Sequence, residues 1–220
     1  MSTHVVYIVY GLLAMGVVDV SFARFRKGRW LILHALANLV ITAFSLSDFV
    51  KTLADPANSC DADYSLIPVY GIAALHLYHM IAFRNLTTSD WVHHLLFGGA
   101  ICTVGILFKS GPLQNFVAFF ICGFPGALDY FMLYCVKQEI LQKFDEKQWN
   151  ARINVWIRSP GLMACCCFIY IASIYGPNDS LCTRNKPIIF IIGMLVFLNG
   201  QYYMQVVVGN TFRKVTSYNS

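Results

Sequence analysis

The sequence predicts an all-α, polytopic membrane protein with seven transmembrane helices, six of them around a central cavity and one preceding them. Three observations predict this class: the composition, the lengths of the apolar stretches and the positions of the charged side chains. Of the 220 residues, 57% are hydrophobic and 12% are charged, about half the charged fraction of a soluble domain. This composition excludes a water-soluble globule, a nucleic-acid binder and a disordered chain.

Seven apolar stretches are long enough to cross the hydrocarbon layer, which takes about 20 helical residues. In chain order they are Val5–Ala23, Trp30–Val50, Leu66–Phe83, Trp91–Phe108, Leu113–Val136, Ile153–Tyr175 and Pro187–Asn210. The longest connection, Lys137 to Arg152, is too short for a soluble domain. We expect an N-terminal transmembrane helix (1–28), a six-helix membrane domain (29–212) and a short cytosolic tail (213–220).

The fifth stretch contains the segment Gly123-Phe124-Pro125-Gly126, which predicts a kink or break in that helix. Proline has no N–H to donate and clashes with the preceding turn. Within a membrane, the carbonyl freed by such a break needs a partner from neighbouring protein or a cavity. We therefore expect this break to face the interior of the bundle.

Basic side chains are distributed unequally between the two sets of loops, which predicts the orientation of the chain. One set holds eleven: Arg24, Arg26, Lys27, Arg29, Arg84, Lys137, Lys143, Lys147, Arg152, Arg213 and Lys214. The other set holds four: Lys51, Lys109, Arg184 and Lys186. Since basic loops stay in the cytosol, we expect a lumenal N-terminus and a cytosolic C-terminus.

Two features lie in loops on the predicted lumenal side. Cys60 and Cys182 either form a disulfide, which an oxidising compartment permits, or remain two free thiols. The segment Asn178-Asp179-Ser180 is a sequon, so Asn178 is a candidate for glycosylation.

Ionisable side chains inside apolar stretches are costly and usually indicate function. The chain places nine there: His34, His76, His79, His93, His94, Asp19, Asp48, Asp129 and Arg158. With a rise of 1.5 Å per residue, most of them lie in the cytosolic half of their helices. We therefore expect one polar chamber that opens to the cytosol, above an apolar lumenal half.

The spacing of Asp90, His93 and His94 favours catalysis. The carboxylate lies three and four residues before the imidazoles, so it can reach either ring and fix its tautomer. A general base or an acyl-accepting nucleophile needs this arrangement. Two alternatives remain open: a hydrogen-bonded structural cluster between helices, and a zinc site that includes His76 and His79.

At these residues the sequence resembles the TLC family, which includes the translocating-chain-associated proteins and the ceramide synthases. Asp90-Trp91-Val92-His93-His94 is similar to the family's aspartate-aromatic segment before paired histidines. Asp129-Tyr130-Phe131-Met132-Leu133, followed by Lys137, resembles its aspartate-hydrophobic-lysine segment. Looser matches are Arg29, Trp30, Asn38, Asn199, Gln201 and Tyr202.

The resemblance implies six helices around a cavity, a location in the endoplasmic reticulum and a role in sphingolipid or other lipid metabolism. Ceramide synthases transfer an acyl group from coenzyme A to an amine. Carried over, His93 and His94 are nucleophile and base, while Asp90 and Asp129 orient or polarise. The expected substrate-binding residues are His34, Asn38, His76, His79, Arg158, Asn199 and Tyr202.

The sequence also departs from the ceramide synthases, which leaves three functions open. Thr87-Thr88-Ser89 replaces the basic run before the aspartate, and Phe97 replaces a threonine. The first function is an acyl-CoA-dependent acyltransferase without a tightly bound cofactor. The second is a non-catalytic lipid-binding, lipid-sensing or scaffold subunit, as a homo-oligomer or in a larger membrane complex. The third is a zinc-dependent lipid hydrolase.

Overall fold

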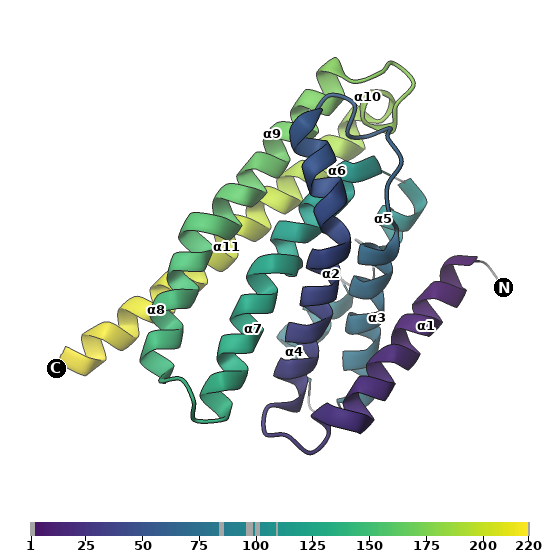
Figure 1. The fold of residues 1–220 in the computed structure, drawn as a ribbon. Coiled ribbons are helices and arrows are strands. Elements are labelled where there is room, and N and C mark those ends of the chain that lie inside the picture. The colour runs from purple at the N-terminus through teal and green to yellow at the C-terminus, as the bar shows by residue number, and fades with distance from the viewer. Residues whose placement is uncertain (1–2, 84–85, 96–98, 100–101, 109, 220) are drawn as a thin grey trace.

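The computed structural model describes residues 3–83, 86–95, 99, 102–108 and 110–219 (Figure 1). Every regular element in these ranges is a helix, in agreement with the predicted all-α class. Five segments are long and apolar enough to cross a membrane: Thr3–Ala23, Arg29–Ala54, Gly111–Lys137, Lys143–Tyr175 and Lys186–Arg213. These segments are typical of an integral membrane protein.

Helix α2 (Arg29–Ala54) is the central element of the N-terminal half. It packs against α3 (Ile67–Ala82) and against the kinked helix formed by residues 111–137. Helix α1 (Thr3–Val18) packs mainly against α3, at the edge of the fold, and none of its residues is buried (Figure 1). A π-helical turn, η1 (Asp19–Ala23), ends this first span and carries its buried residues.

The third and fourth expected spans differ from simple long helices. Helix α3 is apolar but has only 16 residues. The described parts of the fourth stretch form two short helices, α4 (Thr88–His93) and α5 (Cys102–Phe108). Residues 96–98, 100 and 101 lie outside the described ranges. The count of seven spans therefore stays a prediction.

The fifth span is bent as Pro125 predicts. Helix α6 (Gly111–Ala118) continues through a π-helical turn, η3 (Phe119–Gly123), into α7 (Phe124–Lys137). The carbonyl of Ile121 lies four residues before the proline, and it accepts a hydrogen bond of 2.8 Å from Nη2 of Arg158. This contact confirms that the break faces the bundle interior.

The prediction that residues 137–152 form a connection between spans is wrong for most of that segment. Helix α8 (Lys143–Ile153) continues through a π-helical turn, η4 (Asn154–Arg158), into α9 (Ser159–Tyr175). The polar helix α8 is stable here because Glu146 and Asn150 are buried and hydrogen-bonded. The polar composition of this segment by itself indicates a loop, because the side chains that stabilise the helix through hydrogen bonds are themselves polar.

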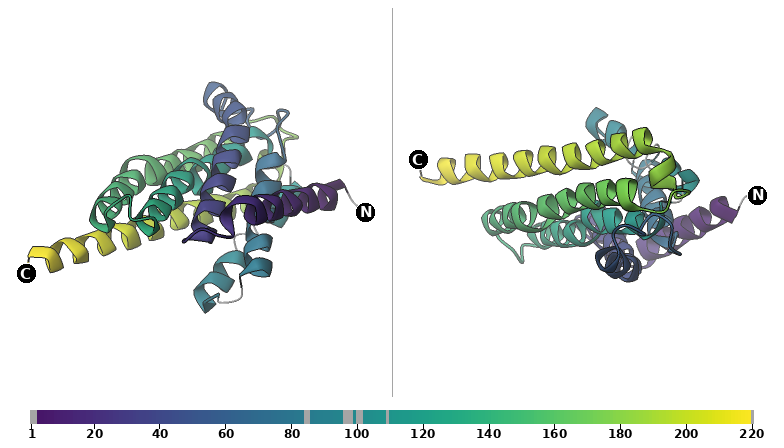
Figure 2. Two further views of the ribbon diagram at one scale, coloured as in Figure 1. Left: turned by 60° about the horizontal axis from the view of Figure 1, so that its bottom comes forward. Right: turned by 90° about the horizontal axis from the view of Figure 1, so that it is seen from above.

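The last two helices close the opposite side of the fold. A short helix, α10 (Leu181–Arg184), precedes α11 (Lys186–Asn219), which packs along α9 and α8. Figures 1 and 2 show the C-terminal end of α11 extending beyond its neighbours. The expected tail at 213–220 is thus a continuation of this helix through Asn219.

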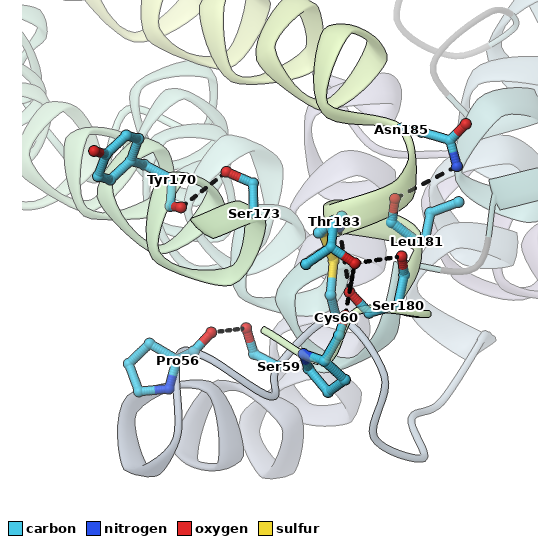
Figure 3. The surroundings of a disulfide bond; sticks show 11 residues. Pro56, Ser59, Cys60, Tyr170, Ser173, Ser180, Leu181, Thr183 and Asn185 are labelled. Carbon is cyan, nitrogen blue, oxygen red and sulfur yellow. Dashed lines mark hydrogen bonds between the residues drawn. A yellow bond between two sulfur atoms is a disulfide. The ribbon is translucent and has the colours of Figure 1, made fainter. Parts of the chain in front are cut away.

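A disulfide links the loop after α2 to helix α10, at the end of the fold where α2 ends and α11 begins. Cys60 and Cys182 are bonded, with their Cα atoms 6.1 Å apart, so the disulfide alternative is the one observed (Figure 3). Beside it, Ser180 caps α10 by accepting a hydrogen bond from the backbone of Thr183. Asn178 is exposed nearby, and its glycosylation stays a prediction.

The same end contains a buried polar contact between α2, α6 and the 55–66 loop. Oδ2 of Asp48 accepts hydrogen bonds from Nδ2 of Asn115 at 2.6 Å and from the backbone of Ser65 at 3.0 Å. Oδ1 of Asp48 lies 2.8 Å from Nζ of Lys51. Each oxygen of the buried carboxylate therefore has a donor, which makes Asp48 a structural residue.

Candidate functional site

Four histidines from three segments of the chain converge at the other end of the fold. The ring centroids of His34 on α2 and His79 on α3 lie 4.9 Å apart. His94, directly after α4, lies 4.6 Å from His79 and 5.1 Å from His76. The side chains of His34, His76 and His94 are buried. The tertiary structure thus brings together all the predicted intramembrane imidazoles except His93, whose side chain lies outside the described residues. We call these four residues the histidine cluster.

The tautomers of two of these histidines are set by their own helices. Nδ1 of His34 and Nδ1 of His76 each lie 2.8 Å from a backbone carbonyl oxygen, those of Trp30 and Ile72. A carbonyl oxygen can only accept, so both Nδ1 atoms carry the proton and both Nε2 atoms are proton acceptors. An imidazole held in this way is oriented as a base, because its Nδ1 proton is fixed on the carbonyl and Nε2 lies on the opposite side of the ring.

Aromatic side chains surround the cluster on the side of α2 and α7. The Trp30 ring stacks on His79 at 5.8 Å and meets the edge of His34 at 5.6 Å. Tyr130 on α7 lies 4.7 Å from His34, and Phe83 meets His79 edge-on at 5.0 Å. These rings exclude water from one side of the imidazoles and restrict their rotation.

Asp90 is the third residue of α4 and takes part in the N-terminal cap of that helix. Its Oδ2 accepts hydrogen bonds of 2.8 Å from the backbone N–H and the hydroxyl of Thr87, while the Thr87 hydroxyl accepts one from the Asp90 backbone. This reciprocal arrangement is a capping box. The hydrogen bonds from Thr87 lower the pKa of Asp90, with a smaller contribution from the nearby His79 and His94. Asp90 therefore lies near the cluster and also has a local structural role.

Asp129 contacts the C-terminal half of the fold. Its Oδ1 accepts a hydrogen bond of 2.6 Å from Nδ2 of Asn150 on α8. The next residue, Tyr130, is the one that contacts the histidine cluster. The segment that resembles the TLC family thus presents its tyrosine to the imidazoles and its aspartate to α8.

Sequence reasoning missed a polar ladder on α8 and η4. Glu146, Asn150 and Asn154 are spaced four residues apart, and Arg158 continues the same spacing. Nδ2 of Asn154 donates to Oδ1 of Asn150 at 2.7 Å, and Nδ2 of Asn150 lies 3.3 Å from Oε1 of Glu146. The i, i+4 spacing was a readable signal, because it places all four side chains on one helix face.

A cavity of about 310 Å³ lies between α3, α5, α6, α9 and α11. Most of its lining is apolar, with Val69, Ile72, Val117, Ile192 and Val196 among the wall residues. Its polar lining includes three of the predicted substrate-binding residues, His76, Arg158 and Asn199. His76 belongs to both the cavity wall and the histidine cluster, so the cluster and the cavity adjoin.

Two other predicted substrate-binding residues lie elsewhere. Asn38 is buried against α7, where its amide lies close to Gly126. Tyr202 is 62% exposed, and its neighbour Tyr203 instead stacks on the Arg158 guanidinium at 5.0 Å. Sequence alone could not distinguish adjacent tyrosines, because their side chains point about 100° apart on a helix.

The described residues contain no group of three or more histidine, cysteine, aspartate or glutamate side chains arranged to hold a metal ion. The zinc hydrolase is a sequence-based hypothesis without support from this geometry.

The comparisons with known proteins found no matching family model, no similar curated protein and no similar solved structure.

Proposed function

We propose that this chain is a TLC-like membrane enzyme that transfers a fatty acyl group from coenzyme A to a nucleophilic group of a lipid. The observation that carries the proposal is the convergence of His34, His76, His79 and His94 next to an apolar cavity. Imidazole bases beside a cavity that fits hydrocarbon match the needs of acyl transfer within a bilayer.

In the proposed reaction the acyl chain occupies the cavity and the thioester carbonyl lies at its His76 end. His94, with His93, removes a proton from the acceptor as its nitrogen or oxygen attacks the carbonyl carbon. The carbon–sulfur bond then breaks, and the same proton passes to the departing thiolate, which leaves as coenzyme A. His79 donates a hydrogen bond to the oxyanion.

The proposed location is the endoplasmic reticulum, with the basic end of the fold in the cytosol. Two observations support this orientation. The first is a surface groove lined by the basic residues Arg26, Lys27 and Lys137. In this groove, Nε2 of Gln138 donates a 2.6 Å hydrogen bond to the Lys27 carbonyl. The disulfide lies at the other end of the fold, as expected for an oxidising lumen.

The test is an assay of purified protein in lipid nanodiscs with long-chain acyl-CoA and a panel of sphingoid-base and lysolipid acceptors. Release of the coenzyme A thiol is measured. We expect His94→Ala to lower the rate about 10²- to 10⁴-fold, as for loss of a general base. His4→Ala is the matched control, because His4 lies outside the cluster, bonded to the Tyr70 hydroxyl at 2.6 Å. Equal turnover by the two variants would contradict the proposal.

One observation favours a second function, a non-catalytic lipid-binding or scaffold subunit. The hydrogen bonds of Asp90 go to Thr87, and that of Asp129 goes to Asn150, so both carboxylates serve helix contacts. This function predicts a lipid that copurifies with the protein, together with no release of thiol from any acyl-CoA. Mass spectrometry of the extracted lipid and the thiol assay distinguish the two functions.

A further inference from the structure

Arg158 is a permanent positive charge in the wall of the cavity, and its half-buried side chain lies within a segment long and apolar enough to span a membrane. Its Nη2 donates to the Ile121 carbonyl, and its guanidinium lies over the Tyr203 ring. Neither contact neutralises the charge. Within the described ranges, no carboxylate oxygen lies within 4.0 Å of this guanidinium as an ion-pair partner. An unpaired charge in such a place is costly, so an anionic partner would stabilise it.

Four polar atoms of the wall residues also lack partners. Nε of Arg158, Oδ1 of Asn199, and both Nε2 and Oε1 of Gln114 are buried without a hydrogen-bond partner among the described residues. The Arg158 and Asn199 atoms accompany the positive charge. Buried polar atoms of native proteins are usually hydrogen-bonded, so unpaired ones in a cavity wall indicate a polar group of a ligand. Nε belongs to the charged guanidinium group. Together with an Nη atom it can donate two parallel hydrogen bonds to a planar anion such as a carboxylate.

The carboxylate of Asp129 interacts electrostatically with the Arg158 guanidinium from a distance. The electrostatic neighbours of Asp129 include Glu146, Arg158 and Lys147. Its recorded hydrogen bond, however, goes to Asn150. Asp129 therefore lowers the cost of burying Arg158 without occupying the guanidinium.

The rest of the cavity selects the tail of the ligand. Apart from Ser110 and Gln114, these walls are apolar. They extend from Ile192 and Val196 on α11 to Leu113 on α6 and to Cys182 of the disulfide. A volume of about 310 Å³ is at the small end of the range for ligand pockets. A volume of this size suits a single hydrocarbon chain better than the two chains of a phospholipid.

We propose that the cavity binds a single-chain fatty acid, with its carboxylate on the Arg158 guanidinium and its chain along the apolar wall. The ligand differs from the acyl thioester of the proposed reaction, because it carries a free carboxylate. Fatty-acid binding would use the same cavity as the proposed reaction, but it does not require that the protein catalyse that reaction. Its test measures binding, so the failure of one does not decide the other.

The test is native mass spectrometry of the purified full chain in detergent, titrated with palmitic acid and with methyl palmitate, which has the same chain without the charge. We expect the acid to bind at least tenfold more tightly than the ester. Arg158→Met should reduce this ratio to about one, and Arg158→Lys should retain part of it. Arg152→Met is the matched control, because Arg152 is an exposed arginine on α8 that stacks on Trp149.

Three outcomes overturn the inference: equal binding of acid and ester by the unaltered chain, an unchanged ratio in Arg158→Met, or equal competition by a two-chain anionic phospholipid. The last result would assign the guanidinium to a headgroup of the bilayer. If Arg158→Met does not fold, Ile192→Trp replaces it as the second variant, because it fills the apolar wall and leaves the charge. It should then weaken binding of acid and ester alike, and undiminished binding would contradict the proposed site.

Discussion

Nη2 of Arg158 donates a hydrogen bond of 2.8 Å to the carbonyl oxygen of Ile121, the residue four positions before Pro125. A proline cannot supply the N–H that this carbonyl would receive in an unbroken helix. The arginine of one span thus compensates for the proline of another. The contact links η3 to η4, the two π-helical turns in the middle of the fold.

The first prediction concerns the coupling of Arg158 and Pro125. Arg158→Met removes the side-chain donor of the Ile121 carbonyl and should destabilise the protein by about 1–3 kcal/mol. Pro125→Ala restores a backbone N–H donor. In a protein that carries Pro125→Ala, we therefore expect Arg158→Met to reduce the free energy of unfolding by about 1 kcal/mol less than it does in the unaltered chain. Thermal unfolding of the four proteins in one detergent measures this cycle. Strictly additive effects would show that the two residues are independent.

The second prediction concerns a buried carboxylate where α1, α2 and α3 meet. Both oxygens of Asp19 accept hydrogen bonds from Arg29, and the Tyr78 hydroxyl donates to Oδ2 at 2.6 Å. Asp19→Asn removes the negative charge and places an amide group against the guanidinium. We expect a loss of about 2 kcal/mol in unfolding free energy, since the arginine retains some solvent.

The control for Asp19→Asn is Glu139→Gln, which removes an exposed pair with Lys27. Exposed ion pairs contribute little, so its melting temperature should match that of the unaltered protein. Similar melting temperatures for the two variants would contradict a structural role for Asp19.

The third prediction concerns the disulfide. Cys60 and Cys182 are 122 residues apart, and closing so long a loop stabilises a fold by up to about 5 kcal/mol. Cys182→Ser should lower the melting temperature clearly, and a reductant should then have no further effect. Cys167→Ser, at an exposed free cysteine, is the control. An equal effect of reductant on Cys182→Ser and on the unaltered chain would disprove the pairing.

The fourth prediction concerns the cap of α4. Because hydrogen bonds from Thr87 lower the pKa of Asp90, the ionised side chain stabilises α4 at neutral pH. This contribution is present above pH 3.8 and is lost as the pH falls through the lowered pKa. Asp90→Ala should cost about 1 kcal/mol and speed amide exchange at the start of α4.

Hydrogen-exchange mass spectrometry compares Asp90→Ala with Thr88→Ala, whose exposed side chain lies next to the cap. Only the first variant should exchange faster at pH 7. Unchanged exchange in Asp90→Ala would leave this carboxylate without a capping role and favour the catalytic one.

The histidine cluster illustrates how much of the site could be predicted. Depth along each helix follows from residue number, so the sequence placed the imidazoles near one end of the fold, as observed. Which imidazoles touch depends on the rotation of α2, α3 and α4 about their axes. The neighbours of His79, for example, are His34 and His94, from segments distant in the chain.

The polar helix α8 illustrates what the sequence could not predict. Its residues are hydrophilic, and hydropathy identifies such a segment with a loop. The helix is stable because Asn150 bonds to Asp129 across the interface with α7. A side-chain partner from another helix carries no signal in local composition.

The sequence alone was sufficient to predict the all-helical membrane class, the break at Pro125 and the placement of the histidines near one end of the fold. These depend on local quantities, namely the length of apolar runs, the missing N–H of proline and the rise per residue. Only the tertiary structure decided that Arg158 donates to the Ile121 carbonyl, that Tyr203 contacts Arg158 while the predicted substrate-binding residue Tyr202 is exposed, and that His76 joins the cluster to the cavity. The physical reason is that packing sets the rotation of each helix, and that rotation selects which side chains meet.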